Sequence, residues 1–419
     1  MNCREFRRYA AKVFRLPDRL AAVADGRRRP HHRLPELLNA LLYGRIFREP
    51  SLHAIEAAAR DGPLFSVCGP ISEDTLGRAL AALEPSSLWG VLIGVGKTAK
   101  RNGMLRSPLL GGKILAAVDG IEVFHSERRA CSACCQRQLK KKRPDGELVE
   151  VTQYYHRVVA LSLVGEDFCL PLGVALIDRG QDEVQPAIAL IREARRRYGP
   201  RFFDVITADG LYGQPSYVAA VRDEMGYGLL FTLKDNQPNL LAEARRRTVR
   251  PEPDRVLRPH ANEEVRLWDE PELWWDTADR MVRVVRSVRD RRRREQYPVR
   301  RDGQLKIERV EVLETRENFY ACLLDPPASP QGIYQAGRSR WDIDTSLFQD
   351  LTDNWHLKHM YRHQPQAFRA MLLLLLLAYA VFMFFVHRHV LPRCRRKPPA
   401  ARTIARRLAE SARVRGPPQ

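Results

Sequence analysis

One uninterrupted apolar segment constrains the fold of this chain more than any other feature. Residues 370–386, AMLLLLLLAYAVFMFFV, carry no charged side chain. Such a segment must leave water, either as a buried core helix or as a membrane span, for which about 17–25 residues are needed. No second span accompanies it, and it follows a helix that carries a candidate site. We therefore expect a core helix, with a protein anchored in a membrane by residues 370–386 as the alternative.

Length and charge further narrow the classes of protein to which this chain can belong. The 419 residues exceed what one hydrophobic core usually serves, so two or three domains are expected. Lys and Arg total 70 against 50 Asp and Glu, a net charge of +20. That surplus favours a polyanionic partner, although a genome of high GC content, which encodes arginine freely, would produce a similar composition. The eight cysteines show no disulfide framework, which indicates a reducing compartment, and residues 1–15 lack the apolar stretch of a signal peptide.

The pattern of apolar and polar residues changes four times along the chain. Leucines at helical spacing predict a helical N-terminal region. A β-β-β-α-β-α-β pattern then predicts a mixed sheet with helices packed on it, in which the basic run QRQLKKK is expected to be a loop. A tryptophan-containing, strand-like stretch follows, then a helix over about 332–359, and last a basic tail that we expect to be exposed. The expected segments are 1–108 (N-terminal region), 109–245 (core, first part), 246–315 (β-rich insertion), 316–390 (core, second part) and 391–419 (tail).

Two aspartates occupy equivalent positions in predicted strands. Asp119 follows the apolar run ILAAV, Asp209 follows DVITA, and glycine comes directly after each. A carboxylate at the end of a buried strand is costly unless it meets water, a cation or a hydrogen-bond donor. An Asp-Gly turn explains either residue taken alone. Two such ends in neighbouring strands of one sheet favour a shared site.

A third carboxylate is expected from the helix GRSRWDIDTSLFQDLTDNWHLKH. At about 100° per residue, Asp344 falls on the apolar face with Phe348 and Leu351, one turn after Arg340, while Asp353 lies on the opposite face. The alternative is an i,i+4 ion pair that only solvates the helix edge. Three carboxylates from separate elements suit two hard cations roughly 3.5–4 Å apart, the arrangement used in phosphodiester cleavage.

These segments together resemble the DDE insertion-sequence transposases of bacteria, in particular the group with a β-rich insertion before the final acid. AAVDGIEVFHSERRACSAC resembles the first Asp-Gly strand of that family and ITADGLYG its second. LLFTLKDNQP resembles its Lys-x-Asn-Gln element, and SRWDIDTSLFQDLTDNWHLKHMYRH its Arg-Trp-x-Ile-Glu helix. The likeness extends over residues 110–385, and the order and spacing of the motifs are more specific than any one of them.

The resemblance implies an RNase H-like mixed sheet flanked by helices and a transposase, an enzyme that cuts DNA ends and joins them to a target. It implies that Asp119, Asp209 and Asp344 are catalytic and hold two Mg²⁺ ions, for which Mn²⁺ can substitute. It also implies double-stranded DNA as partner and a helical N-terminal region, residues 1–108, that serves DNA binding or dimerisation. A homodimer in the active complex, no membrane, and a bacterial cytoplasmic location with the nucleoid are implied as well. The DNA-binding residues expected are Arg340, Lys234 and Asn236.

Three positions depart from the family pattern. Asp344 stands where the family usually has Glu, and Gly337 where it has Tyr. The signature Lys would fall at Leu351 or Thr352, and neither is basic. Either the site works with three aspartates, which is our expectation, or the chain is a catalytically decayed, transposase-derived DNA-binding protein. A plain nuclease without strand transfer is a further alternative.

Three other features each have a chemical and a structural interpretation. Cys131, Cys134 and Cys135, with His125 or His156, could bind Zn²⁺, but no second CxxC accompanies them, and a loop of free thiols is the favoured interpretation. Glu183 resembles a position near the family's site, yet an acid at a helix N-terminus explains it more simply. Base stacking or a small hydrophobic core would each account for the insertion tryptophans, Trp268, Trp274 and Trp275.

Overall fold

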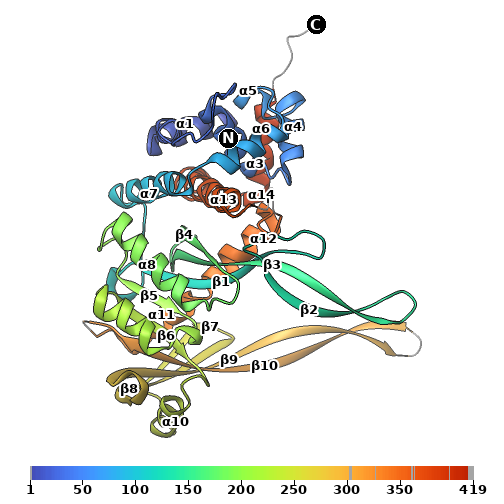
Figure 1. The fold of residues 1–419 in the computed structure, drawn as a ribbon. Helices are drawn as coiled ribbons and strands as arrows, with labels where there is room; N and C mark the ends of the chain where they lie inside the picture. The colour runs from blue at the N-terminus through green and yellow to red at the C-terminus, as the bar shows by residue number, and fades with distance from the viewer. Residues whose placement is uncertain are drawn as a thin grey trace. The chain divides into compact units, whose positions relative to one another are not determined.

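The computed structural model of the chain describes residues 2–301, 304–325, 327–359, 362, 364–395 and 397–413 (Figure 1). The chain forms two compact units. Unit 1 comprises residues 1–107, 116–202 and 341–419, and unit 2 comprises residues 108–115 and 203–340.

Unit 1 begins with a series of short helices. Polar residues cap several of them: Asn2, Ser51 and Ser72 each accept a hydrogen bond from the backbone N–H three residues later. These caps satisfy N–H groups that the first turn of a helix leaves without partners. The helices are α1 (Cys3–Phe14), α2 (Leu16–Ala21), α3 (Leu34–Ile46), α4 (Leu52–Asp61), α5 (Phe65–Cys68), α6 (Glu73–Ala82) and α7 (Pro85–Arg101).

The long apolar segment forms α13 (Pro365–Phe385), which continues into the π-helical segment η6 (Val386–Val390). This helix is long and apolar enough to cross a membrane, yet 94% of its most apolar window is buried inside the protein. It contacts α3, α6, α7 and strand β4 (Figure 1). The rest of unit 1 therefore covers its apolar surface, which agrees with a core helix.

The strands of unit 1 are organised around one long strand, β3 (Leu148–Val164). β3 pairs with β1 (Leu115–Ser126), with β2 (Cys135–Lys142) along its first half, and with β4 (Leu170–Ile177) along its second half. α8 (Val184–Tyr198) packs on β3 and β4. The basic run QRQLKKK lies in β2, so the expectation of a loop was wrong. The extra length of β3 supplies the backbone partners that this polar strand needs.

Unit 2 contains the parallel pair β5 (Val205–Ala208) and β6 (Gly228–Leu233). A 3₁₀ turn η2 (Gly210–Tyr212), helix α9 (Pro215–Val218) and a π-helical segment η3 (Ala219–Glu224) connect them. β6 then pairs with an antiparallel series in the order β10, β9, β8, β7, and α10 and α11 complete the unit. Their bounds are β7 (Arg255–His260), β8 (Glu263–Trp275), β9 (Arg280–Arg301), β10 (Gln304–Leu323), α10 (Pro238–Arg247) and α11 (Pro330–Ser339).

Parallel and antiparallel strands flanked by helices confirm the predicted mixed α/β class. In unit 1, β3 lies between β1 and β4, and α8 follows them in the chain. In unit 2, β5 and β6 form the parallel pair that comes next. Three strands, a helix and two parallel strands, in this order along the chain, are the elements of an RNase H-like core.

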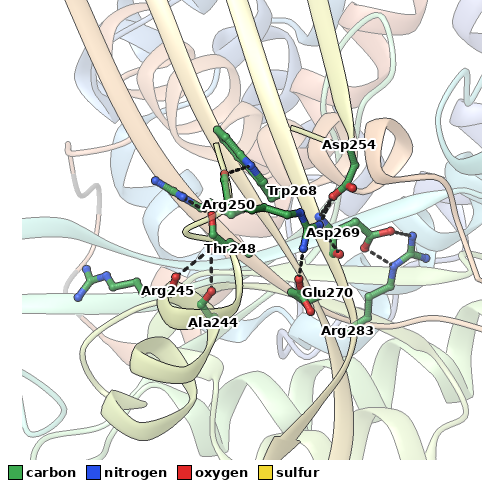
Figure 2. Close-up of polar contacts among 10 residues, drawn as sticks. Ala244, Arg245, Thr248, Arg250, Asp254, Trp268, Asp269, Glu270 and Arg283 are labelled. Carbon is green, nitrogen blue, oxygen red and sulfur yellow. Dashed lines mark hydrogen bonds and ion pairs between the residues drawn. The ribbon is translucent and has the colours of Figure 1, made fainter. Parts of the chain in front are cut away.

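The inner end of the insertion is held by a polar network, which Figure 2 shows. Arg283 donates two hydrogen bonds to the Asp269 carboxylate, at 2.8 and 2.7 Å. The Trp268 indole N–H donates to the Arg250 carbonyl at 2.9 Å, and the Arg250 guanidinium pairs with Glu270 and with Asp254. Trp268 is therefore part of the core of the insertion rather than a surface for a base.

The helix expected over 332–359 is interrupted. α11 ends at Ser339, the π-helical segment η5 spans Ile343–Phe348, and α12 covers Gln349–Trp355. A π-helix closes its hydrogen bonds over five residues, which turns the following side chains to another face.

The expectation of an exposed C-terminal tail was wrong. Helix α14 (Ala401–Ala412) buries Ile404 and Leu408 and packs on α1.

Candidate active site

Asp209 lies where the buried strand β5 ends, as predicted. Its backbone is extended, and the 3₁₀ turn that follows buries Tyr212. The Lys234 ammonium, at the end of the parallel neighbour β6, lies 2.8 Å from Asp209 Oδ1 and 2.9 Å from Oδ2. A carboxylate and an ammonium therefore meet where two parallel strands end.

The KDNQ segment after β6 holds the turn that carries Asp209. Asn236 donates a side-chain hydrogen bond to the Gly210 carbonyl, and Gln237 donates one to the Gly213 carbonyl, both at 2.7 Å. The side-chain oxygen Oε1 of Gln237 accepts in turn from the indole N–H of buried Trp275 at 2.7 Å. The segment thus fixes the position of the acid through the backbone, and it ties that turn to the insertion.

Gly210 is required by close packing in the same turn. A Cβ at this position would come within 2.8 Å of the Lys234 side chain and 2.9 Å of the Thr232 carbonyl. Any larger residue would push the lysine away from Asp209. The glycine after the acid therefore allows the ion pair to form.

The surroundings of Asp209 keep it ionised. Burial by itself raises the pKa of the Asp209 carboxyl, but this is outweighed by the hydrogen bond from Lys234, the Gly210 N–H, and the charges of Lys234 and Arg340. The net result is a pKa below the ordinary value for aspartate. The carboxylate is consequently available as an anionic ligand at neutral pH.

Arg340 contributes to this potential from a buried position. It follows the last residue of α11, and only 3% of its surface is exposed. Its charge lowers the pKa of Asp209. Unit 2 therefore brings together Asp209 and all three residues expected to bind DNA, namely Arg340, Lys234 and Asn236. Their contact with DNA stays a prediction.

Asp119 differs in its setting from the prediction. Strand β1 does not end there but continues to Ser126, so Asp119 and Gly120 do not form the turn that was the structural alternative. The Gly120 N–H donates to Asp119 Oδ1 at 2.9 Å. The four preceding residues of the strand are fully buried, whereas Asp119 is half-buried. The carboxylate thus lies at the point where β1 emerges from the core.

Glu183 lies at the N-terminus of α8, as expected, and its side chain packs against Gly120, the residue after Asp119. Its carboxylate covers Gly120, where a Cβ would meet Glu183 Oε2 at 2.0 Å. Arg157 donates to the same carboxylate at 2.8 Å. Glu183 precedes α8 but makes no side-chain capping bond to it. Glu183 is therefore a buried acid that contacts the Asp119 segment, and its role in the site stays a prediction.

Asp344 is half-buried within the π-helical segment η5 of unit 1. Ile343 and Leu347 in the same segment are buried. π-Helical turns are rare and are frequent at functional sites. Asp353, on the following helix, is exposed as predicted, so Asp344 is the more buried of these two acids.

A family model described as "Transposase DDE domain" matches residues 140–381, more than half of the chain. The chain belongs to this transposase family. The matched residues include Asp209 and Asp344, whereas Asp119 precedes them. No curated protein matches the sequence. Among solved structures, a piggyBac transposase synaptic complex with hairpin DNA is similar at a TM-score of 0.47 and 11% identity, covering 98% of this chain and 80% of that chain.

One departure of this transposase from the family pattern has a structural reason. The Tyr320 ring, from β10, lies where a side chain at Gly337 would be, 2.4 Å from the position of a Cβ. Tyr320 is buried and contacts the Tyr334 ring edge-on at 6.3 Å. An aromatic ring from a neighbouring strand therefore occupies the space beside residue 337.

The missing lysine of this transposase has no substitute at the predicted positions. Leu351 is buried and Thr352 is half-buried. Lys234 and Arg340 are the cations that act on Asp209. Asp119 and Asp344 belong to unit 1 and Asp209 to unit 2. The joint site of the three acids stays a prediction.

Proposed function

We propose that this transposase cuts the ends of a DNA element and joins them to target DNA by metal-dependent hydrolysis and strand transfer. The observation that carries the proposal is the ionised Asp209 in its turn, inside the segment that matches the DDE domain. A site built only for folding would have no need of a carboxylate kept charged at the end of a strand by two cations.

The donor set suits a hard divalent cation. We propose that Asp119, Asp209 and Asp344 hold two Mg²⁺ ions, which Mn²⁺ can replace. Carboxylate oxygens are the ligands that Mg²⁺ prefers in proteins. Bound there, such ions would activate the attacking hydroxyl and stabilise the leaving oxygen. Asp344 is one methylene shorter than the usual Glu, and it lies in a π-helical turn rather than a regular helix.

Lys234 has a role of its own in this proposal. Its ammonium now neutralises Asp209, and its side chain is half exposed. A cation held by Asp209 would replace the ammonium as its partner, and Lys234 would then be placed to contact a DNA phosphate. Asn236 and Gln237 keep the turn in place while Lys234 moves, because their hydrogen bonds go to backbone carbonyls.

A basic cavity in unit 2 supports DNA binding. Its volume is about 640 Å³, between β7, the middle of β9 and α11. Glu263 is the acidic residue of the lining, 4.0 Å from Arg291 and 3.6 Å from Arg338. Guanidinium groups bind phosphate in a bidentate manner, which makes such a cavity suitable for a DNA backbone. The basic residues that line it are Arg258, His260, Arg289, Arg291 and Arg338.

We also propose a homodimer in the active complex, acting in a bacterial cytoplasm on the nucleoid. Two ends must be joined to one target, and two copies would supply one active site for each end. The cysteines that the structure describes are all free, as suits a reducing compartment.

The experiment is a plasmid assay that uses the DNA flanking the coding region, searched first for terminal inverted repeats. Wild-type protein with Mg²⁺ should nick at the repeats and yield joined products, and Asp209→Ala should reduce nicking at least ~100-fold, since even a partner of a metal ligand contributes about 10–100-fold. Asp353→Ala, a matched change at an exposed aspartate, should behave as wild type. Unimpaired nicking by Asp209→Ala would refute the proposed site.

The second candidate is a decayed transposase that binds DNA without cutting it. The absence of a basic residue at Leu351 and Thr352 favours it, because a phosphate contact is lost there. The same assay separates the two. Retarded DNA bands without nicks, at any concentration of Mg²⁺ or Mn²⁺, would establish the decayed protein. Nicks without joined products would instead indicate a plain nuclease.

A further inference from the structure

Two cysteines and a histidine of unit 1 converge outside the candidate active site. Cys131 Sγ lies 3.6 Å from Cys134 Sγ, and His156 Nε2 lies 3.4 Å from each sulfur. Cys134 and His156 are buried, and Cys131 is half-buried. Three groups that commonly bind soft or borderline metals therefore point at one small volume.

The three separations fit the edges of a zinc tetrahedron. Zinc bonds of about 2.3 Å to sulfur and about 2.0–2.1 Å to nitrogen, at tetrahedral angles, place two sulfurs about 3.8 Å apart and a sulfur about 3.5 Å from a nitrogen. The observed distances are 3.6, 3.4 and 3.4 Å. A cation at the common centre requires only a small expansion of this triangle.

Local backbone structure builds the two-cysteine half of the cluster. Residues 131–134 form a tight turn in which the Cys134 N–H donates to the Cys131 carbonyl at 3.1 Å. The Cys131 N–H points at Cys134 Sγ, 3.4 Å away. The turn thus holds the two sulfurs close together before any metal binds.

The third ligand is positioned by packing. His156 lies on β3, and its ring packs against Phe368 of α13 with 4.9 Å between ring centres. Cys135, the next residue after the turn, is excluded from the cluster, because its sulfur is directed toward the Ile177 carbonyl. His125 is exposed and does not belong to the cluster either. The structure thus selects His156 among the candidates that the sequence left open.

We propose that Cys131, Cys134 and His156 bind one Zn²⁺ ion, with water as the fourth ligand. Binding displaces one proton from each cysteine thiol and none from neutral imidazole, so two protons are released. Zinc suits this set because thiolate and imidazole bind it in preference to Mg²⁺. The proposal concerns a site apart from the three aspartates and does not rest on the proposed function.

The site would fasten the base of a basic hairpin. The turn 131–134 connects β1 to β2, and His156 lies on β3 next to Tyr155, the residue that pairs with Cys135. Beyond this point β2 carries the exposed residues Lys140, Lys141 and Lys142. A cation that joins the turn to β3 would fix the hairpin where it leaves the rest of unit 1.

Metal content of the purified full-length chain tests the site directly. Protein expressed with zinc in the medium should hold about one zinc per chain by elemental mass spectrometry. Cys134→Ser and His156→Ala should each lose most of it. Cys135→Ser and His125→Ala, matched changes at the neighbouring cysteine and histidine, should retain it. Cobalt in place of zinc should show sulfur-to-cobalt charge transfer in the wild-type protein.

A second measurement covers variants that fail to fold. Removing the metal from wild-type protein with a chelator should increase hydrogen exchange in residues 131–156 and leave α7 unchanged. A wild-type protein that holds no zinc and shows no cobalt spectrum would overturn the proposal. Equal zinc loss in Cys135→Ser would also overturn it. None of these measurements uses DNA, so their failure is separate from failure of the transposase chemistry.

Discussion

Asp209 owes its charge to a small number of neighbours, and this makes its behaviour predictable at the residue scale. Burial raises the pKa of its carboxyl, while Lys234, the Gly210 N–H and Arg340 lower it. Because the cations prevail, the carboxylate stays ionised until the pH falls through its lowered pKa. Removal of Lys234 leaves the effect of burial in place, so the pKa of Asp209 should rise.

We predict that Lys234→Met shifts the acidic limb of the pH profile for nicking toward higher pH. The pKa of Asp209 should rise when its principal cation is lost, and protonated Asp209 cannot serve as an anionic ligand. Stability should fall by no more than about 1 kcal/mol, because Lys234 is half exposed. The measurement is nicking rate against pH. Lys234→Arg should restore the wild-type limb, and an unmoved limb in Lys234→Met would show that the pair does not control Asp209.

Residue-level features were only partly predictable from the sequence. The position of Asp209 at the end of a strand was predicted correctly, because an apolar run that ends at Asp-Gly is a local signal. The same signal misled at Asp119, where pairing with β3 carries the strand onward. Glu183 and His156 owe their positions to contacts with Gly120 and with the turn 131–134, which lie far from them in sequence. No local pattern contains such contacts.

At the scale of elements, α11 packs against β10 through a glycine. The Tyr320 ring approaches Gly337 so closely that a Cβ at residue 337 would lie 2.4 Å from it. We predict that Gly337→Ala lowers the free energy of unfolding by about 1–3 kcal/mol through overpacking. Chemical denaturation measures this loss.

The control for Gly337→Ala is a glycine without neighbours. Gly90 lies inside α7, and a Cβ there would meet nothing within 4 Å. Gly90→Ala should stabilise the protein by about 0.5–1 kcal/mol through helix propensity. The double variant Gly337→Ala with Tyr320→Leu should lose less free energy of unfolding than the sum of the losses in the two single variants. Strict additivity would show that the two side chains do not compete for space.

The apolar helix α13 gives a second prediction at this scale. Leu375 is fully buried within unit 1, so Leu375→Ala should cost about 2–5 kcal/mol, the range for a cavity in a packed core. Leu148→Ala, at an exposed leucine, should change stability by less than about 0.5 kcal/mol. Thermal unfolding of detergent-free protein measures both. Recovery only in detergent, with no effect of Leu375→Ala, would favour a membrane span.

Elements were predictable where one periodicity prevails and unpredictable where tertiary contacts decide. α8 and the strands around Asp209 follow their apolar patterns. Nothing in the sequence between Ser339 and Ile343 is a glycine or proline, so the interruption before η5 has no local signal. β2 is polar on both faces and exists because β3 extends to pair with it. α14 did have a signal, since Ile404 and Leu408 are one helical turn apart.

At the scale of the whole molecule, the net charge of +20 predicts a strong dependence of DNA binding on salt. Each neutralised phosphate contributes a slope of about −0.9 to the logarithm of affinity against the logarithm of salt concentration. We predict that replacing Lys140, Lys141 and Lys142 with Ala makes this slope shallower by about 2–3. Replacing them with Arg should preserve it. An unchanged slope in the alanine variant would remove β2 from the DNA-binding surface.

We propose that acids from three distant segments, Asp119, Asp209 and Asp344, share bound divalent ions. Iron-mediated cleavage of the polypeptide tests it most directly, because Fe²⁺ in a magnesium site generates radicals that cut the nearest backbone. With Fe²⁺ and ascorbate, we predict cuts beside Asp119, Asp209 and Asp344 that excess Mg²⁺ suppresses and that Asp209→Ala removes at all three. Cuts beside only one of these residues, or a pattern indifferent to Asp209→Ala, would contradict a shared site.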